Sequence, residues 1–319
     1  MILFIVIATV AALVVLFLLG PRDRVAPGVP FSADSLGDNL DAVLARSEAK
    51  YPDIRPGLQK EIIWRDPGTK ARTDWAIVYI HGFSAAKPET RPLPDLVADA
   101  LGANLFFTRL TGHGRTGEAL AQANGGDWLN DAAEALAIGR RIGKRVLVMA
   151  TSTGATAVAP LALDNEAGAD AMVFVSPNFG LRAKGAEYMT IPWGRQIATW
   201  VLGRERNAAT DNEAYNTGWT VRYPTVSLAP MMALVQHVRR LPFEEARTPV
   251  MMLHAPDDQV VQPAASRTVF ARWGAPKLWL DVPGTRGPTH HVIAGDIINP
   301  EMTEPLAARI IDWVRSLDR

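Results

Sequence analysis

The sequence of 319 residues predicts an α/β fold, with a mostly parallel central sheet flanked by helices and an inserted helical segment. Short apolar runs rich in β-branched residues alternate with helical patterns, which is typical of a parallel sheet covered on both faces. This rhythm stops over residues 178–247, which are rich in Trp, Tyr and Met and contain no clear strand. One stretch, Arg145–Leu163, joins a predicted strand to a predicted helix through a turn too short for an ordinary loop. These three observations lead to the fold class.

The first 20 residues carry no charge and are almost wholly apolar. About 18 consecutive apolar residues are enough to span a bilayer as a helix. A basic start and an A-x-A-like site are both missing, which favours an uncleaved transmembrane anchor over a cleaved signal peptide. Arg22 and Arg24 follow the span, and the positive-inside rule then favours a cytoplasmic position for the rest of the chain. We therefore expect a single-pass membrane anchor over residues 1–20.

Residues 21–59 are expected to form a linker and one short helix. The linker is Pro21–Pro30, which is rich in turn-forming residues. The helix is indicated by four apolar residues at helical spacing, Leu36, Leu40, Val43 and Leu44. Two prolines, Pro52 and Pro56, end it.

The predicted core covers residues 60–177 and 248–319, and residues 178–247 are expected to be a mostly helical lid over the carboxyl edge of the sheet. Its strands are expected at the apolar runs Glu61–Trp64, Trp75–Ile80, Asn104–Thr108, Val146–Ala150, Ala171–Val175, Pro249–Leu253 and Lys277–Val282. Its helices are expected at Leu93–Leu101, Trp128–Ile142, Ala155–Leu163, Pro263–Trp273 and Thr303–Leu317.

Composition and motifs argue against several classes of function. The formal net charge of +0 leaves no electrostatic footprint for nucleic acid. The chain has no cysteine, and its histidines lack the spacing of a metal site. Gly112–Gly117 matches G-x-G-x-x-G after a strand, but the helix and second strand that a dinucleotide site requires do not follow it. We therefore expect no cofactor and no bound metal.

The turn Thr151–Gly154 carries the candidate nucleophile. A strand that turns directly into a helix lifts the residue at its apex out of the sheet, which is the geometry of the nucleophile elbow G-x-S-x-G. Here Ala150 stands at the first glycine position, Gly154 is kept, and Ser152 is the candidate nucleophile. A serine at this place is also a common helix N-cap, so other residues of the chain are needed to distinguish a nucleophile from a cap.

A second motif, His81-Gly-Phe83, follows a predicted strand directly. A glycine there lets the backbone come close to a substrate, and the N–H of Phe83 is free to donate. Acyl transfer needs two such donors facing the oxyanion, and the residue after the nucleophile, Thr153, would supply the other. A plain turn between strand and helix is the alternative explanation of this motif.

Candidate acid and base groups follow the later strands. Asp257 and Asp258 come just after the strand ending at Leu253, where a carboxylate can orient an imidazole and stabilise its charged form. His290 and His291 follow the last strand. Neighbouring residues point in different directions, so only one histidine of this pair can meet the candidate serine.

Serine, aspartate and histidine follow one another along the chain in the order found in α/β-hydrolases. From about Trp64 to Arg319 the chain resembles that superfamily, in its carboxylesterase and monoacylglycerol-lipase-like branch. The segments that carry the resemblance are His81-Gly-Phe, Arg109-Leu-Thr-Gly-His-Gly114, Ala150-Thr-Ser-Thr-Gly154, Asp258 with the Val-Val after it, and His291-Val-Ile. The resemblance implies a triad of Ser152, Asp258 and His291, with an oxyanion hole from Phe83 and Thr153. It favours Asp258 over Asp257 and His291 over His290.

The expected activity is that of a serine hydrolase that cleaves carboxylic esters through an acyl-enzyme. The apolar N-terminus and the aromatic insertion suggest lipophilic acyl esters of the monoacylglycerol or lysophospholipid type. An amidase, peptidase or acyltransferase would keep the same triad, and the sequence leaves these alternatives open. A catalytically inactive, membrane-tethered binding protein is the alternative from another class. The presence of serine, aspartate and histidine together with both oxyanion positions speaks against it.

Overall fold

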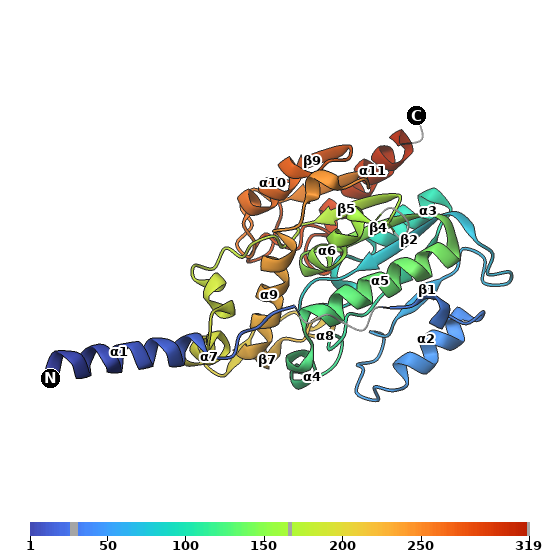
Figure 1. Ribbon diagram of the computed structural model, residues 1–319. Coiled ribbons are helices and arrows are strands. Elements are labelled where there is room, and N and C mark those ends of the chain that lie inside the picture. The colour runs from blue at the N-terminus through green and yellow to red at the C-terminus, as the bar shows by residue number, and fades with distance from the viewer. Residues whose placement is uncertain (26–30, 165–167, 318–319) are drawn as a thin grey trace.

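The computed structural model describes residues 1–25, 31–164 and 168–317. Within these residues the main sheet has seven strands in the order β1-β3-β2-β4-β5-β8-β9 (Figure 1). The strands are Glu61–Ile63 (β1), Thr73–Ile80 (β2), Asn104–Phe107 (β3), Gly143–Thr151 (β4), Ala171–Val175 (β5), Val250–His254 (β8) and Lys277–Asp281 (β9). Only β1 pairs antiparallel, with β3, among these strands, which confirms the expected mostly parallel sheet.

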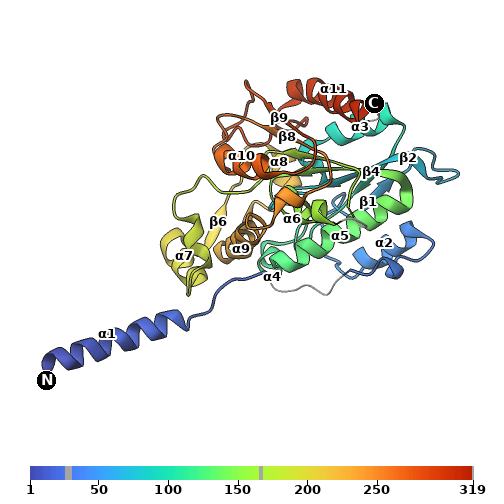
Figure 2. The same ribbon diagram turned by 45° about the horizontal axis from the view of Figure 1, so that its top comes forward.

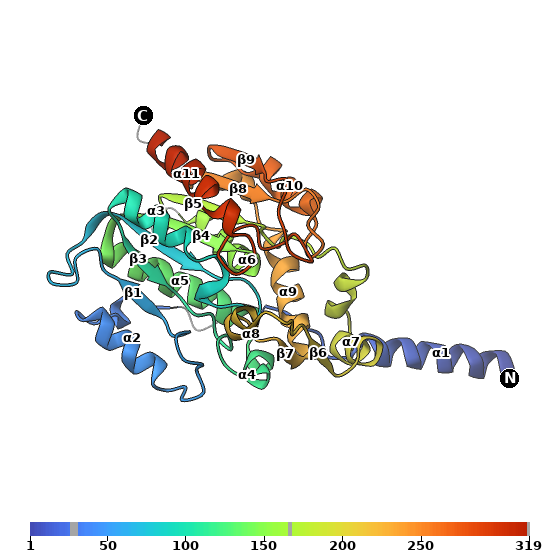
Figure 3. The same cartoon turned by 180° about the vertical axis from the view of Figure 1, so that it is seen from behind.

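Helices cover both faces of this sheet. The α-helices are Ile2–Leu18 (α1), Leu40–Glu48 (α2), Leu93–Leu101 (α3), Gly117–Gln122 (α4), Gly125–Ile142 (α5), Thr153–Val158 (α6), Gly194–Leu202 (α7), Glu213–Gly218 (α8), Leu228–Val238 (α9), Pro263–Arg272 (α10) and Pro300–Ser316 (α11). The 3-10 helices are Ala33–Ser35 (η1), Lys87–Thr90 (η2), Ala159–Leu163 (η3), Ala186–Thr190 (η4), Thr225–Ser227 (η5) and Phe243–Glu245 (η6). Side chains of α5, α6, α9 and α10 join one hydrophobic cluster. Those of α3 and α11 join a second cluster on the opposite face of the sheet. Figure 3 shows the ribbon of these two helices after a turn of 180° from the view of Figure 1.

The central strand β4 is longer than its apolar run predicts. It begins at Gly143, where an added Cβ would lie 2.5 Å from the Cβ of Ala76, so strand and neighbour meet too closely for a side chain. The predicted helix Ala155–Leu163 is split between α6 and η3. Pro160 lies at the start of η3 and has no N–H to continue the α-helical bonding.

The predicted transmembrane anchor over residues 1–20 is wrong. Helix α1 has 17 residues and projects away from the other elements (Figure 2). At about 1.5 Å per residue it is roughly 26 Å long, short of a hydrocarbon core of roughly 30 Å. Across the described ranges, no helix combines the length and the apolarity needed to cross a bilayer. The predicted membrane localisation with a cytoplasmic domain depended on this anchor and is therefore not supported either.

The helix stops early because of the residues that follow it. Pro21 cannot continue a helical hydrogen-bond pattern, and an added Cβ on Gly20 would overlap the ring of Trp193 in the insertion. The backbone N–H of Trp193 donates to the Pro21 carbonyl at 2.8 Å, and Arg195 pairs with Asp23. The N-terminal chain therefore leaves its helix to dock on the insertion. The rest of the predicted linker, residues 26–30, lies outside the described residues.

The stretch between β5 and β8 contains α7, α8 and α9, as its aromatic and Met-rich composition predicts. It also contains two short strands, Glu205–Asn207 (β6) and Arg222–Pro224 (β7), which pair antiparallel with each other. The insertion is expected to be mostly helical, and these two short strands are an addition to that expectation. These three-residue segments have no alternation of apolar and polar residues by which a strand is recognised.

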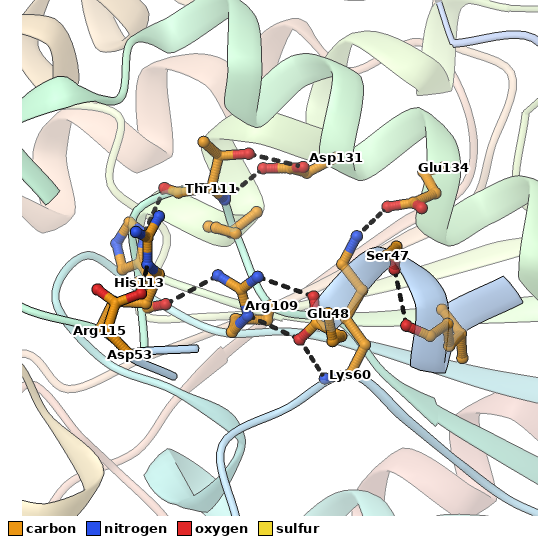
Figure 4. Close-up of polar contacts among 12 residues, drawn as sticks. Ser47, Glu48, Asp53, Lys60, Arg109, Thr111, His113, Arg115, Asp131 and Glu134 are labelled. Carbon is orange, nitrogen blue, oxygen red and sulfur yellow. Dashed lines mark hydrogen bonds and ion pairs between the residues drawn. The ribbon is translucent and has the colours of Figure 1, made fainter. Parts of the chain in front are cut away.

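Helix α2 and β1 are held to the core by buried ion pairs (Figure 4). The guanidinium of Arg109 donates to both carboxylate oxygens of Glu48, at 2.7 and 2.8 Å, and Lys60 pairs with Glu134. Burial raises the pKa of Glu48, but the hydrogen bond and charge of Arg109 outweigh it and leave that pKa below its ordinary value. The N-terminal segment is thus bonded to the loop that follows β3.

Candidate active site

The turn between β4 and α6 consists of the single residue Ser152. Its φ of 51° and ψ of −117° lie where a side chain is strained, so the surrounding contacts must hold the turn. The Ser152 N–H donates to the carbonyl of Val175 at 2.9 Å. The side chain makes no capping hydrogen bond to α6, in contrast to the N-cap alternative.

Small residues around Ser152 allow this sharp turn. An added Cβ on Gly154 would lie 2.5 Å from the backbone oxygens of Ile80 and His81. Ala150, which stands in place of the first glycine, is fully buried and in register with Ile80 of β2. The methyl group therefore fits at position 150, whereas position 154 has no room for one.

The structure brings Ser152, His291 and Asp258 together from three separate elements. His291 Nε2 lies 3.0 Å from the Ser152 hydroxyl, and His291 Nδ1 lies 2.7 Å from Asp258 Oδ2. Asp258 is fully buried, and its other oxygen accepts hydrogen bonds from the backbone N–H groups of Val260 and Val261. Since the carboxylate accepts the proton on Nδ1, Nε2 is left to accept the serine proton.

The neighbouring acid and histidine form a separate pair. Asp257 is exposed and lies 3.4 Å from His290 Nδ1. His290 has a φ of 53°, and its Nδ1 lies 2.8 Å from the Thr285 carbonyl. The left-handed backbone at position 290 turns this side chain away from the one after it. Of the two candidates at each place, the structure puts Asp258 and His291 beside the serine.

The loop after β2 and the start of α6 supply two backbone donors near the serine. Phe83 lies in this loop and Thr153 is the first residue of α6. Among the described residues, neither N–H group has a hydrogen-bond partner. The loop is held from outside, because the N–H of Thr220 in the insertion donates to the Ser84 carbonyl at 2.7 Å.

The insertion packs aromatic side chains beside two segments of this site. Tyr215 and Trp219 stack with their ring centroids 4.4 Å apart, and they pack with Ala85 of the loop after β2 and with Val292, the residue after His291. Ser152 itself is only 6% exposed to solvent.

Arg55, in the N-terminal segment, binds the end of α8 in the insertion. Its guanidinium donates to the carbonyl oxygens of Asn216, Thr217 and Trp219 at 3.2, 2.9 and 3.0 Å. These carbonyls lie at or just beyond the end of α8, where helical carbonyls lack partners. A residue from outside the insertion thus holds the end of this helix in place.

One residue of this region has no signal in the sequence. Glu89 lies in the Lys-Pro-Glu-Thr stretch of η2, yet it is only 2% exposed and accepts a hydrogen bond from the N–H of Gly82 at 2.8 Å. Burial raises its pKa to about 7. Only tertiary contacts show that this carboxyl is buried beside the nucleophile.

Metal ligation finds no support in the described part of the chain. No group of three or more histidine, aspartate or glutamate side chains is placed there to hold an ion. The absence of a metal or cofactor stays a prediction.

Three comparisons place the chain among known proteins. The family described as serine aminopeptidase, S33 (Hydrolase_4), matches residues 71–282. No curated protein sequence gives a significant match. Among solved structures, one from the study of the metagenome-derived lipolytic enzymes LipS and LipT is similar with a TM-score of 0.64 and 16% identity, over 82% of this chain and 99% of that one.

Two monoacylglycerol lipases are similar to about the same degree. The enzyme from Paleococcus ferrophilus has a TM-score of 0.58 and 15% identity, over 81% of this chain and 98% of its own. A soluble variant of the Saccharomyces cerevisiae monoglyceride lipase has a TM-score of 0.60 and 15% identity, over 81% and 90%. At such identities these likenesses establish the fold, and the family match covers most of the core. The chain is therefore a serine hydrolase of the α/β-hydrolase superfamily and belongs to the serine aminopeptidase S33 family.

Proposed function

We propose that this protein hydrolyses carboxylic esters, with Ser152 as nucleophile, His291 as general base and acid, and Asp258 as the group that orients the imidazole. The observation that carries the proposal is the unbroken hydrogen-bond chain from the Ser152 hydroxyl through His291 to Asp258. An attacking hydroxyl needs a base within hydrogen-bond reach, and that base needs a partner for its positive charge.

In the first half of the reaction, the Ser152 oxygen attacks the ester carbonyl carbon and its proton passes to Nε2 of His291. The carbonyl oxygen becomes an oxyanion that accepts hydrogen bonds from the N–H groups of Phe83 and Thr153. The bond to the alcohol then breaks, and His291 gives its proton to the departing oxygen. The acyl group is left on Ser152.

In the second half, water attacks the acyl carbon while His291 Nε2 takes one of its protons. The bond to the Ser152 oxygen breaks, the carboxylic acid leaves, and His291 returns the proton to the serine. Asp258 stays ionised throughout and stabilises the imidazolium in both halves.

The substrate we propose is a lipophilic acyl ester of the monoacylglycerol or lysophospholipid type. Support comes from the aromatic side chains of the insertion, Tyr215, Trp219 and Tyr223, the last of which packs edge-on against Phe83 with ring centroids 5.5 Å apart. The names of the lipolytic enzyme and the monoacylglycerol lipases with the same fold point the same way. We take residues 178–247 to act as a lid on a core of residues 60–177 and 248–319.

A fluorophosphonate probe and a panel of acyl esters test this proposal. We expect the probe to label the protein and Ser152→Ala to abolish labelling, with a loss of hydrolysis on the order of 10⁵- to 10⁶-fold. Ser84→Ala, in the neighbouring loop, is the matched control and should keep both. Hydrolysis of p-nitrophenyl esters should rise with chain length, while aminoacyl p-nitroanilides should be poor substrates.

Three outcomes would contradict it. Equal labelling of Ser152→Ala and the unchanged protein would show that the nucleophile lies elsewhere. Faster turnover of aminoacyl p-nitroanilides than of any ester would favour a peptidase or amidase. A protein that neither reacts with the probe nor turns over any substrate would be a binding protein.

A further inference from the structure

Glu89 is a buried carboxyl group that the proposed reaction steps do not use. It stands on η2, directly after the loop that holds Phe83. The cations nearest to it in sequence have other partners, since Lys87 pairs with Glu61 and Arg91 pairs with Asp95. The Glu89 carboxyl therefore has no ion-pair partner among the basic residues of its own segment.

The contacts of Glu89 reach the two segments of chain that carry the proposed oxyanion donors. One carboxylate oxygen, Oε2, accepts the N–H of Gly82 at 2.8 Å and the hydroxyl of Tyr79 at 3.0 Å. The Tyr79 oxygen also lies 3.1 Å from the hydroxyl of Thr151. Since Tyr79 gives its proton to Glu89, Thr151 donates to Tyr79.

These partners stand next to the groups that would perform the chemistry. Gly82 precedes Phe83, and Thr151 precedes Ser152. The Glu89 carboxylate is thus hydrogen-bonded directly to Gly82, the residue before the first backbone donor. It is linked through Tyr79 to Thr151, the residue before the nucleophile. A change in its position would move both.

The carboxylate also lies against the turn itself. A Cβ added to Gly82 would meet Glu89 Oε1 at 2.8 Å and the Ser152 Cβ at 3.1 Å. The two groups therefore lie on either side of a space that holds no side chain, so a methyl group at position 82 would push either the carboxylate or the nucleophile away.

Three titratable groups face Glu89 from the elements packed around it. They are Tyr79 of β2, Tyr215 of α8 and His291 of the loop between β9 and α11. Burial and the charge of Glu89 both raise the pKa values of the two tyrosines, which therefore stay neutral.

We infer that Glu89 is a positioning residue of the hydrolytic site: its hydrogen bonds fix the two segments that carry the oxyanion donors relative to each other. This inference rests on the proposed function. Oxyanion donors act mainly in the transition state, so disturbing them lowers kcat more than it changes KM.

The test is kcat and KM, measured separately on a p-nitrophenyl ester, for three variants. Glu89→Ala removes the hydrogen bonds, and we expect kcat to fall about 10- to 100-fold with KM within about twofold. Glu89→Gln keeps an oxygen that can accept both bonds, and we expect it to restore most of kcat. Tyr79→Phe removes the bond that links Glu89 to Thr151, so kcat falls while KM changes little.

Glu61→Gln is the matched control, because it removes a carboxylate that contacts the same 3-10 helix through Lys87. It should leave kcat unchanged. If Glu89→Ala does not fold, as judged by its thermal transition, Tyr79→Phe still tests the inference, because it removes one bond and keeps the carboxyl group.

Failure of this inference is distinguishable from failure of the proposed function. If Ser152→Ala is inactive but Glu89→Ala and Tyr79→Phe keep the wild-type kcat, Glu89 has no positioning role and the hydrolase proposal stands. If Ser152→Ala retains hydrolysis, the proposed function is wrong whatever the Glu89 variants do. An equal fall of kcat in Glu61→Gln would also overturn the inference.

Discussion

Replacing Glu89 with glutamine should change how the stability of the protein depends on pH. In the folded protein, burial raises the pKa of Glu89 from the ordinary 4.5 to about 7. A carboxyl group with a raised pKa contributes its full share of stability below pH 4.5, where it is protonated in both states. This contribution to stability is lost as pH rises through 7, because the Glu89 carboxyl ionises more readily in the unfolded chain than in the folded protein.

The expected size follows from the pKa difference. A rise from 4.5 to about 7 is about 2.5, which at about 1.36 kcal/mol for each pKa unit corresponds to about 3 kcal/mol. Because Glu89 is only 2% exposed, solvent screening does not reduce this figure much. Glutamine does not ionise, so its contribution to stability does not change over this pH range. Between pH 4.5 and pH 8, the free energy of unfolding of the variant should therefore rise by about 3 kcal/mol relative to that of the wild type.

The assay is urea-induced unfolding followed by circular dichroism at several pH values across this range. The quantity to compare is the free energy of unfolding of Glu89→Gln minus that of the wild type in the same buffer. Its absolute value at one pH also contains any change in hydrogen bonding, so only its variation with pH counts. A difference that stays constant from pH 4.5 to pH 8 would refute the reasoning.

Three further predictions concern the elbow, the proposed triad and the buried ion pair. Gly154→Ala places a methyl group 2.5 Å from two backbone oxygens and should lower the free energy of unfolding by about 3 kcal/mol, seen as a lower thermal transition. Asp258→Asn removes the charge 2.7 Å from the imidazole and should reduce kcat/KM by about 10³- to 10⁴-fold without loss of the fold, measured on a p-nitrophenyl ester. Arg109→Met leaves the buried carboxylate of Glu48 unpaired and should cost about 3–5 kcal/mol in urea unfolding. Adding Glu48→Gln to that variant should recover part of the loss, and no recovery would show that the ion pair is not the cause.

The sheet and the central turn could be predicted from the sequence because their residues are buried together. Strands such as Ala171–Val175 are wholly apolar and occur in the structure with the predicted bounds. The placement of Ser152, Asp258 and His291 side by side also agrees with the order of these residues and with the family resemblance. Their catalytic roles remain proposals.

The N-terminal helix shows where composition misleads. An uncharged apolar stretch has the same composition whether its helix ends at Leu18 or continues, and the contact of Gly20 with Trp193 that accompanies the end joins residues far apart in sequence. Burial of Glu89 is also made by contacts between elements, because its partners Tyr79 and Gly82 lie on β2 and the loop after it, ten and seven positions earlier. Contacts between separate elements leave no periodic pattern in the sequence by which they could be predicted.

The three carbonyl bonds of Arg55 have a consequence for protein engineering. The insertion does not supply all of its own contacts, because the cation that binds the carbonyls at the end of α8 lies more than 150 positions earlier in the chain. A chimera that imports residues 178–247 into a related hydrolase would leave those carbonyls without their donor. Exchange of substrate preference between such enzymes would succeed only if the graft carries the Arg55 segment with it.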